Sequence, residues 1–236
     1  MIDILIDNRL IMNSNVNDYV TGVFDEELPN RFMARVIINN SKETCYVKSS
    51  SRLSNYLPMK GKKVILKKNL NSKFRYYIYS VRFKSSQILL CPSYANEIVA
   101  DSFKKKVFSF LGKRKKFEKE VLIGKYKSDI FLNKEKVFIE IKSIISDSSS
   151  ALFPVVYSER FDKQLELFVD ILKEYKGYLF LVCFNPYTIK ITINRNNMNY
   201  AHLVDAVNNG LVVKGFVIGY KNNNPEIKKE IPVEII

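Results

Sequence analysis

Histidine and cysteine are scarce in this sequence, and each scarcity removes a class of function. The chain of 236 residues has one histidine and three cysteines. The lone histidine, His202, leaves little for mechanisms that need paired histidines or a Cys–His or Ser–His couple, and we interpret it as a surface residue near a predicted helix. Cys45, Cys91 and Cys183 are far apart and form no CxxC arrangement, so neither a disulfide framework nor a zinc site is indicated.

Phosphate-binding glycine loops and long apolar runs are absent as well. The sequence has no GxxxxGK[ST] motif and no GxGxxG after a strand, which argues against a nucleotide-phosphate loop. No stretch reaches the roughly 18 uninterrupted apolar residues that a membrane helix needs. The start, MIDILIDNRL, does not have the basic-then-apolar order of a signal peptide, because Asp3 and Asp7 interrupt it. We therefore expect a cytoplasmic protein with no membrane partner.

Negative charge is in short supply, since 38 Lys and Arg face 24 Asp and Glu and leave a net charge of +14. Such a charge attracts polyanions, which include nucleic acid, anionic membrane and acidic protein. Charge does not choose among these, and lysines that only keep the chain in solution are the alternative. Residues 1–90 are more basic per residue than residues 91–236, as a dedicated binding module would explain.

The order of predicted elements indicates two parts. Residues 1–90 contain five short strand patterns separated by turn residues, typical of a small barrel or sandwich: RFMARVIINN, ETCYVKS, KGKKVILKK, KFRYYIYSVRF and SQILLC. Residues 91–236 continue with helical periodicity at 94–111, a strand hairpin, an amphipathic helix at 159–176, a buried strand at 178–184, a helix near 197–209 and a last strand. The fold class predicted is α/β (α+β), with an all-β module followed by an α/β domain.

The segment KSDIFLNKEKVFIEIKS carries the strongest chemical signal. Side chains alternate along a strand, so Glu140 and Lys142 point to the same side. Asp129 lies on the preceding strand and can approach Glu140 across the sheet. Two neighbouring carboxylates favour Mg²⁺ or Mn²⁺, and the nearby lysine can orient an attacking water or offset charge on a phosphate. The alternative is an ordinary solvent-exposed Glu-x-Lys pair.

A second segment, residues 73–84, interleaves cations with aromatic rings, as in surfaces that stack bases and follow phosphates. Some of these aromatics must instead fill the barrel core. The nucleic-acid contacts predicted for the first part of the chain are Lys48, Arg52, Arg75, Tyr77 and Arg82. The lysines at 104–106 and the KRKK run at 113–116 extend the same track or form a solvated face.

Beyond these patterns, the chain resembles the sugar fermentation stimulation protein A family. The resemblance runs from about Leu28 to the C-terminus, through LPNRFMARV, IEIKS, ALFPVVYSERFDKQLELF and GLVVKGFVIGY. The Asp-x(10)-Glu-x-Lys spacing is also similar to the PD-(D/E)xK nuclease pattern. The resemblance implies an N-terminal OB-like β-barrel, a C-terminal restriction-endonuclease-like domain with a mixed central sheet, DNA binding and metal-dependent nuclease chemistry.

The residues that match the family motif are carried over by position. Asp129, Glu140 and Lys142 would be the catalytic triad, and Glu120 would complete the metal site. The residues that match around the start of the long helix are Glu159, Arg160, Lys163 and Gln164. Arg160, Lys163 and Gln164 are predicted to contact nucleic acid, as is Lys127 on the key strand. The chain departs from the family pattern at Val155, at Phe161 and at Lys127, where the family has an Arg. It also departs in the loop at 47–52. We therefore expect the substrate contacts of the barrel loop and the helix start to differ from those of the family.

Three functions remain open at this point. The first is a Mg²⁺- or Mn²⁺-dependent nuclease that acts on DNA or RNA. The second is a non-catalytic DNA-binding regulatory protein that retains a nuclease-like fold. A basic assembly protein, such as a ribosome-associated factor, would explain the charge but not the carboxylate pair. The sequence does not decide the oligomeric state, and a homodimer is one alternative.

Overall fold

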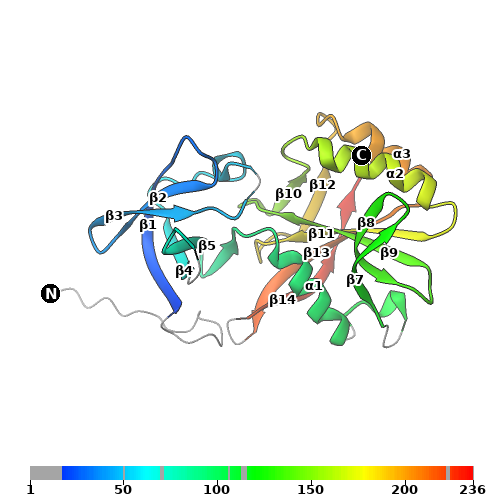
Figure 1. Ribbon diagram of the computed structural model, residues 1–236, viewed down its shortest axis with the longest axis horizontal. Helices are drawn as coiled ribbons and strands as arrows, with labels where there is room; N and C mark the ends of the chain where they lie inside the picture. The colour runs from blue at the N-terminus through cyan, green and yellow to red at the C-terminus, as the bar shows by residue number, and fades with distance from the viewer. Residues whose placement is uncertain are drawn as a thin grey trace.

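The first six strands form a closed antiparallel barrel (Figure 1). The computed structural model describes residues 18–49, 51–69, 72–105, 107–112, 116–221 and 224–235. The strand order is β3-β2-β1-β4-β5-β6, and a parallel pairing of Tyr46 with Tyr77 joins β3 to β5 and closes the ring. This confirms the predicted OB-like barrel. Its strands are β1 (Tyr19–Glu27), β2 (Met33–Ile38), β3 (Ser41–Tyr46), β4 (Lys63–Lys68), β5 (Tyr76–Phe83) and β6 (Ser86–Leu89).

Strand β1 is an addition to the strands predicted from sequence. Its segment, YVTGVFDEE, has a glycine in its interior and three acids at its end, which disfavour a strand. The glycine is required by a close approach, because a Cβ at Gly22 would lie 2.6 Å from Val36 Cγ1 and 2.8 Å from the Ile37 carbonyl oxygen. The glycine therefore allows β1 to approach β2 closely at this position.

A mixed six-stranded sheet forms the centre of the second part of the chain. Its order is β14-β13-β11-β9-β8-β7, with β11 parallel to both neighbours and the outer pairs antiparallel. The strands are β7 (Glu118–Ile123), β8 (Tyr126–Leu132), β9 (Val137–Ile144), β11 (Lys176–Cys183), β13 (Val212–Lys221) and β14 (Asn224–Ile231). A small parallel sheet lies beside it, made of β10 (Ser150–Phe153), β12 (Lys190–Ile193) and β15 (Val233–Glu234).

Helices cover both faces of the mixed sheet (Figure 1). Helix α1 (Tyr94–Lys104) packs on one face, and α2 (Glu159–Ile171) and α3 (Tyr200–Asn208) lie side by side on the other. Two short 3-10 helices occupy Leu53–Asn55 and Ser109–Leu111. Helix α1 ends earlier than predicted because the chain turns to bury Phe108 against Phe180 and Phe216. Among the described residues, no helix is long and apolar enough to cross a membrane.

Two hydrophobic cores follow from this layering. One contains alternate residues of β9, such as Ile139 and Ile141, together with α1 and the interior of the barrel. The other contains Phe138 of β9 together with residues of α2 and α3. The first core is shared by the barrel and the mixed sheet, so packing alone does not separate two domains. The domain boundary expected between residues 90 and 91 stays a prediction.

Candidate active site

Asp129 lies where β8 and β9 separate. The paired register of the two strands ends at Ile130 and Ile139, one residue short of Asp129 and Glu140. The freed backbone N–H of Ile141 donates a hydrogen bond of 2.8 Å to Asp129 Oδ2. The other carboxylate oxygen accepts a hydrogen bond of 2.9 Å from Asn96 Nδ2 of helix α1. The side chain of Asp129 is therefore fixed by two elements that are distant in sequence.

Glu140 is almost completely buried, with 3% of its surface exposed. Its Oε2 accepts a hydrogen bond of 2.6 Å from the Tyr126 hydroxyl, and its Oε1 forms a 2.6 Å ion pair with Lys142 Nζ. The same ammonium group donates to Gln164 Oε1 of α2 at 2.8 Å and lies 4.9 Å from the centre of the Phe161 ring. A buried carboxylate needs such partners because it has lost its hydration.

The two carboxylates influence each other. Burial, followed by repulsion from Glu140, raises the pKa of Asp129 to about 6. Burial and the neighbouring Glu140 also raise the pKa of the Tyr126 hydroxyl, which keeps Tyr126 a hydrogen-bond donor. Ionised Asp129 and Glu140 therefore lie close enough to repel, and a divalent cation bound by hard oxygen ligands would offset that repulsion.

These groups line one side of a cavity of about 480 Å³. The barrel contributes Tyr56 to its wall, and the start of α1 contributes Ser93 and Asn96. The residues of the apolar wall come from β9 and the residue after it, from β10, from the segment before α2 and from the start of α2: Ile141, Ile144, Ile145, Leu152, Phe153, Pro154, Val155, Val156 and Phe161. A substrate group that enters this cavity would meet carboxylates and an ammonium on one side and apolar surface on the other.

The predicted triad is brought together in one place, since Asp129, Glu140 and Lys142 all line this cavity. Glu120 is not among the lining residues. It is exposed on β7, where it forms an ion pair with Lys127, and this pairing lowers the pKa of its carboxyl group. The structure therefore gives no geometric support to the prediction that Glu120 completes the metal site.

Predicted contacts around α2 gather at a second hollow of about 390 Å³ next to the first. Arg160 lines both cavities. The other residues around the second one are Lys125, Tyr126, Lys127, Glu159, Lys163, Gln164 and Leu167. Four of the eight side chains are cationic, and two of these, Lys127 and Lys163, form ion pairs with Glu120 and Glu159. The remaining cations, Lys125 and Arg160, give the hollow an excess of positive charge that suits an anionic group such as a phosphate.

The contacts predicted on the barrel are more scattered. Tyr77 is 5% exposed, its hydroxyl lies 3.1 Å from that of Tyr94, and Lys48 Nζ sits 3.7 Å from its ring centre. The ring therefore has no open face on which a base could stack. Arg52 donates hydrogen bonds to the carbonyl oxygens of Leu28 and Pro29, which fixes a loop.

Two other predicted barrel cations are more accessible. Arg75 is exposed and Arg82 is half-buried, so both retain surface for a ligand. Among the lysines expected to extend the track, Lys104 and Lys105 are exposed and form ion pairs with Asp101 and Glu226. Lys106 and residues 113–115 lie outside the described residues.

Asn96 and Tyr126 are the site residues that sequence reasoning missed. Asn96 belongs to an amphipathic helix and is 33 residues away from Asp129 in the chain, so no local pattern connects the two. Tyr126 is only three residues before Asp129, but its direction depends on how β8 begins. Each of the two side chains positions a carboxylate through a hydrogen bond, and neither belongs to a recognisable sequence motif.

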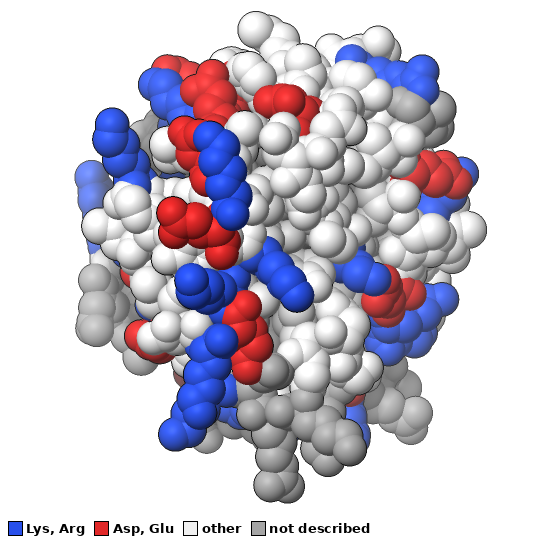
Figure 2. All heavy atoms as spheres, turned by 90° about the vertical axis from the view of Figure 1, so that its right-hand side faces the viewer, with Lys and Arg blue, Asp and Glu red and all other residues white. Residues whose placement is uncertain are grey.

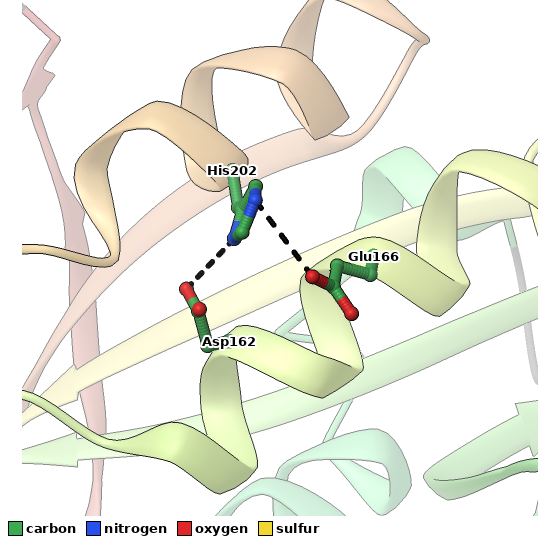
Figure 3. A group of neighbouring side chains, drawn as sticks. All are labelled: Asp162, Glu166 and His202. Carbon is green, nitrogen blue, oxygen red and sulfur yellow. Dashed lines mark ion pairs between the residues drawn. The ribbon is translucent and has the colours of Figure 1, made fainter.

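A separate polar group joins α2 to α3 (Figure 3). His202 Nδ1 lies 2.9 Å from Asp162 Oδ1, and His202 Nε2 lies 3.8 Å from Glu166 Oε1. These three side chains could hold a metal ion, because one ligand atom from each lies within 4.8 Å of the others. The hydrogen bond to Asp162 raises the pKa of His202. His202 is 42% exposed, as expected for a surface residue.

Charges of both signs alternate on the face shown in Figure 2. Blue Lys and Arg side chains are interspersed with red Asp and Glu side chains across it. The net charge of +14 is therefore not gathered into one uniformly positive patch on this face.

Comparison with known proteins shows one family. The family model described as "Sugar fermentation stimulation protein RE domain" matches residues 93–224. A sugar fermentation stimulation protein homolog from Alkaliphilus oremlandii is 31% identical over 175 residues, which cover 69% of this chain and 73% of the relative. A homolog from Thermosipho melanesiensis is 23% identical over 221 residues, covering 92% and 95% of the two chains.

One solved structure shares the whole architecture. It is described as Pyrococcus furiosus SfsA in complex with Ca²⁺ and superimposes with a TM-score of 0.81 at 17% identity. The match covers 96% of this chain and 99% of the other, so both the barrel and the α/β part have counterparts there. At this identity the likeness shows the fold.

Proposed function

The chain belongs to the sugar fermentation stimulation protein family, and from this premise we propose that it is a DNA-binding nuclease that hydrolyses phosphodiester bonds with the help of Mg²⁺ or Mn²⁺. The observation that carries the proposal is the convergence of Asp129, Glu140 and Lys142 in one cavity. The nuclease-like family model, which spans all three residues, supports the same activity.

The donor set suits a hard divalent cation. Asp129 and Glu140 offer oxygen ligands, which Mg²⁺ and Mn²⁺ prefer, and the described residues that line the cavity include neither histidine nor cysteine. Asp129 carries a raised pKa that a nearby cation would lower. The relative from Pyrococcus furiosus is described as a complex with Ca²⁺, another cation bound through oxygen. When bound, the metal would supply Lewis-acid activation of water and of the phosphate.

The residues of the chain then have separate roles. Asp129 and Glu140 would hold the cation, while Asn96 and Tyr126 keep the two carboxylates in position through their hydrogen bonds. Lys142 Nζ, held between Glu140 and Gln164, would offset charge on a phosphate oxygen or orient water at that oxygen. The apolar wall would reduce contact between a bound substrate and bulk water.

A DNA-binding regulator without turnover is the second candidate, and one observation favours it. Every carboxylate oxygen of Asp129 and Glu140 already has a hydrogen-bond or ion-pair partner within the chain. These partners hold the acidic pair in position without a cation, although the repulsion between the two carboxylates remains. A binder would still use the cationic hollow beside it.

Cleavage assays separate the two candidates. Labelled single- and double-stranded DNA and RNA would be incubated with the protein in Mg²⁺, Mn²⁺ or EDTA. Cleavage should require the metal and be lost in Asp129→Ala and Glu140→Ala. The matched control is Asp170→Ala, an exposed acid on α2 that pairs with Lys173, and it should cleave like the wild type. Salt-sensitive DNA binding without cleavage in any metal would establish the regulator instead.

A further inference from the structure

Three aromatic rings on the barrel form two stacked pairs that share Tyr46. The rings of Phe32 and Tyr46 have centroids 6.4 Å apart and planes 28° apart, and those of Tyr46 and Phe74 are 6.1 Å and 13° apart. All three side chains are partly exposed. We call Phe32, Tyr46 and Phe74 the aromatic row.

The row is assembled at the seam where the barrel closes. Tyr46 ends β3 and is the residue that pairs with β5, while Phe32 precedes β2 and accepts a 2.8 Å backbone hydrogen bond from Val47. Phe74 stands two residues before β5 begins. The three rings thus come from three segments of the chain, and their common orientation is a property of the closed barrel.

Filling of the core does not explain the row. Tyr46 packs against the hydrophobic core, but Phe32 and Phe74 belong to neither of the two cores. Other ring pairs involving the barrel meet edge-on, such as Tyr19 with Tyr79 at 68° and Phe83 with Tyr187 at 65°. Packed rings favour either edge-on or offset-stacked contact, and only a stacked row can be extended by another flat ring at an open end.

A cation contacts the ring at one end of the row, and two more flank the residue at the other end in sequence. The guanidinium of Arg31 lies 4.9 Å from the centre of the Phe32 ring. Lys73 and Arg75, the neighbours of Phe74 in sequence, are both exposed. A polyanion with flat apolar groups matches this pattern, since the cations attract its phosphates while its rings stack on the row.

From this arrangement we infer that the aromatic row binds the unpaired bases of single-stranded nucleic acid. A duplex hides the faces of its bases in its own stack, so only an unpaired strand can place them on protein rings. The inference rests on the proposed function and deepens it, because it names single-stranded nucleic acid as the substrate class delivered to the cavity.

Binding of two matched strands tests the inference. Oligo-dT and an abasic strand of equal length carry the same phosphates, so the difference between their affinities reports the bases alone. Fluorescence anisotropy in EDTA measures this difference without any cleavage. The wild-type chain should bind oligo-dT at least about 5-fold more tightly than the abasic strand, the lower end of what stacking of one base contributes.

Leucine variants locate the effect. Phe32→Leu and Phe74→Leu keep apolar volume but remove the ring, and each should weaken oligo-dT binding by at least about 5-fold while leaving abasic binding unchanged. Phe83→Leu is the matched control, because Phe83 is also a partly exposed barrel ring with a nearby lysine but packs edge-on. Its oligo-dT affinity should equal that of the wild type.

Equal affinity of the wild-type chain for the two strands would overturn the inference, and so would an equal loss in Phe83→Leu. The ratio measured on the wild type needs no variant, so it decides the question even if a variant fails to fold. The outcome is also independent of the nuclease proposal. A chain that prefers oligo-dT but never cleaves would keep the aromatic row and lose the catalytic role.

Discussion

Replacing Asp129 with asparagine should stabilise the metal-free protein at neutral and alkaline pH. Burial and repulsion from Glu140 raise the pKa of Asp129 from 3.8 to about 6. A carboxyl group with a raised folded-state pKa favours folding when protonated, so its contribution is complete below pH 3.8 and is lost as the pH rises through about 6. Each pKa unit corresponds to about 1.4 kcal/mol. Ionised Asp129 therefore costs the folded state roughly 3 kcal/mol above pH 7.

Asparagine removes this cost and can keep both hydrogen bonds. Its side-chain oxygen can accept from the backbone N–H of Ile141, as Asp129 Oδ2 does. Its amide group can donate to Asn96 once the Asn96 amide turns over, since oxygen and nitrogen exchange places in that rotation. The expected gain in the free energy of unfolding is up to about 3 kcal/mol at pH 8 and close to zero at pH 4.

Urea unfolding of the wild type and Asp129→Asn in EDTA, at pH 4 and pH 8, measures the gain. Asp170→Asn is the matched control, because the ion pair with Lys173 lowers the pKa of Asp170 and its substitution should bring no gain at pH 8. Addition of Mg²⁺ should stabilise the wild type but not Asp129→Asn. The difference between their free energies of unfolding should therefore become smaller. If Asp129→Asn is equally destabilising at both pH values, the ionised carboxylate does not destabilise the folded state and the reasoning fails.

The remaining predictions concern groups around the cavity and on α2. Tyr126→Phe deletes the donor to Glu140 and should reduce metal-dependent cleavage or Mg²⁺ affinity about 10- to 100-fold, measured by cleavage rates across a Mg²⁺ titration; an unchanged profile would contradict a positioning role. Lys142→Ala should slow cleavage on the order of 100-fold or more while DNA affinity in EDTA stays near that of the wild type, and equal losses in both assays would place Lys142 in binding instead. His202→Gln should destabilise the protein at pH 5.5 but not at pH 9, because the raised pKa of His202 makes its bond to Asp162 stabilising below about pH 6.5 and ineffective once the histidine is neutral; urea unfolding at both pH values checks this, and a pH-independent loss would contradict it.

Local patterns in the sequence were sufficient for the strands that carry the site. The period of two in β9 places Ile139 and Ile141 in one core and Phe138 in the other, so the shared side of Glu140 and Lys142 could be predicted. The short turn between β8 and β9 made the approach of Asp129 predictable as well. These features depend on residues less than fifteen positions apart, which a strand hairpin relates directly.

Contacts between distant segments could not be read in this way. Tyr77 was predicted to face a ligand because it alternates with cations along β5, but β5 is buried on both faces over most of its length. One face belongs to the barrel core, and on the other side the start of α1 brings Tyr94 against Tyr77 and Tyr79. A strand covered on both sides has no outward face, and only the placement of α1 reveals that cover.

The position of the Lys142 ammonium depends on α2, and α2 in turn depends on α3. Gln164 of α2 accepts a hydrogen bond from Lys142 Nζ. Two residues earlier on the same helix, Asp162 accepts a hydrogen bond of 2.9 Å from Asn199 and has its Oδ1 2.9 Å from His202 Nδ1. Both partners belong to the start of α3. A change in the charge of His202 therefore alters a contact that lies within one helical turn of Gln164. It follows that loss of the His202 contact should shift the pH dependence of cleavage without removing any group that touches the phosphate.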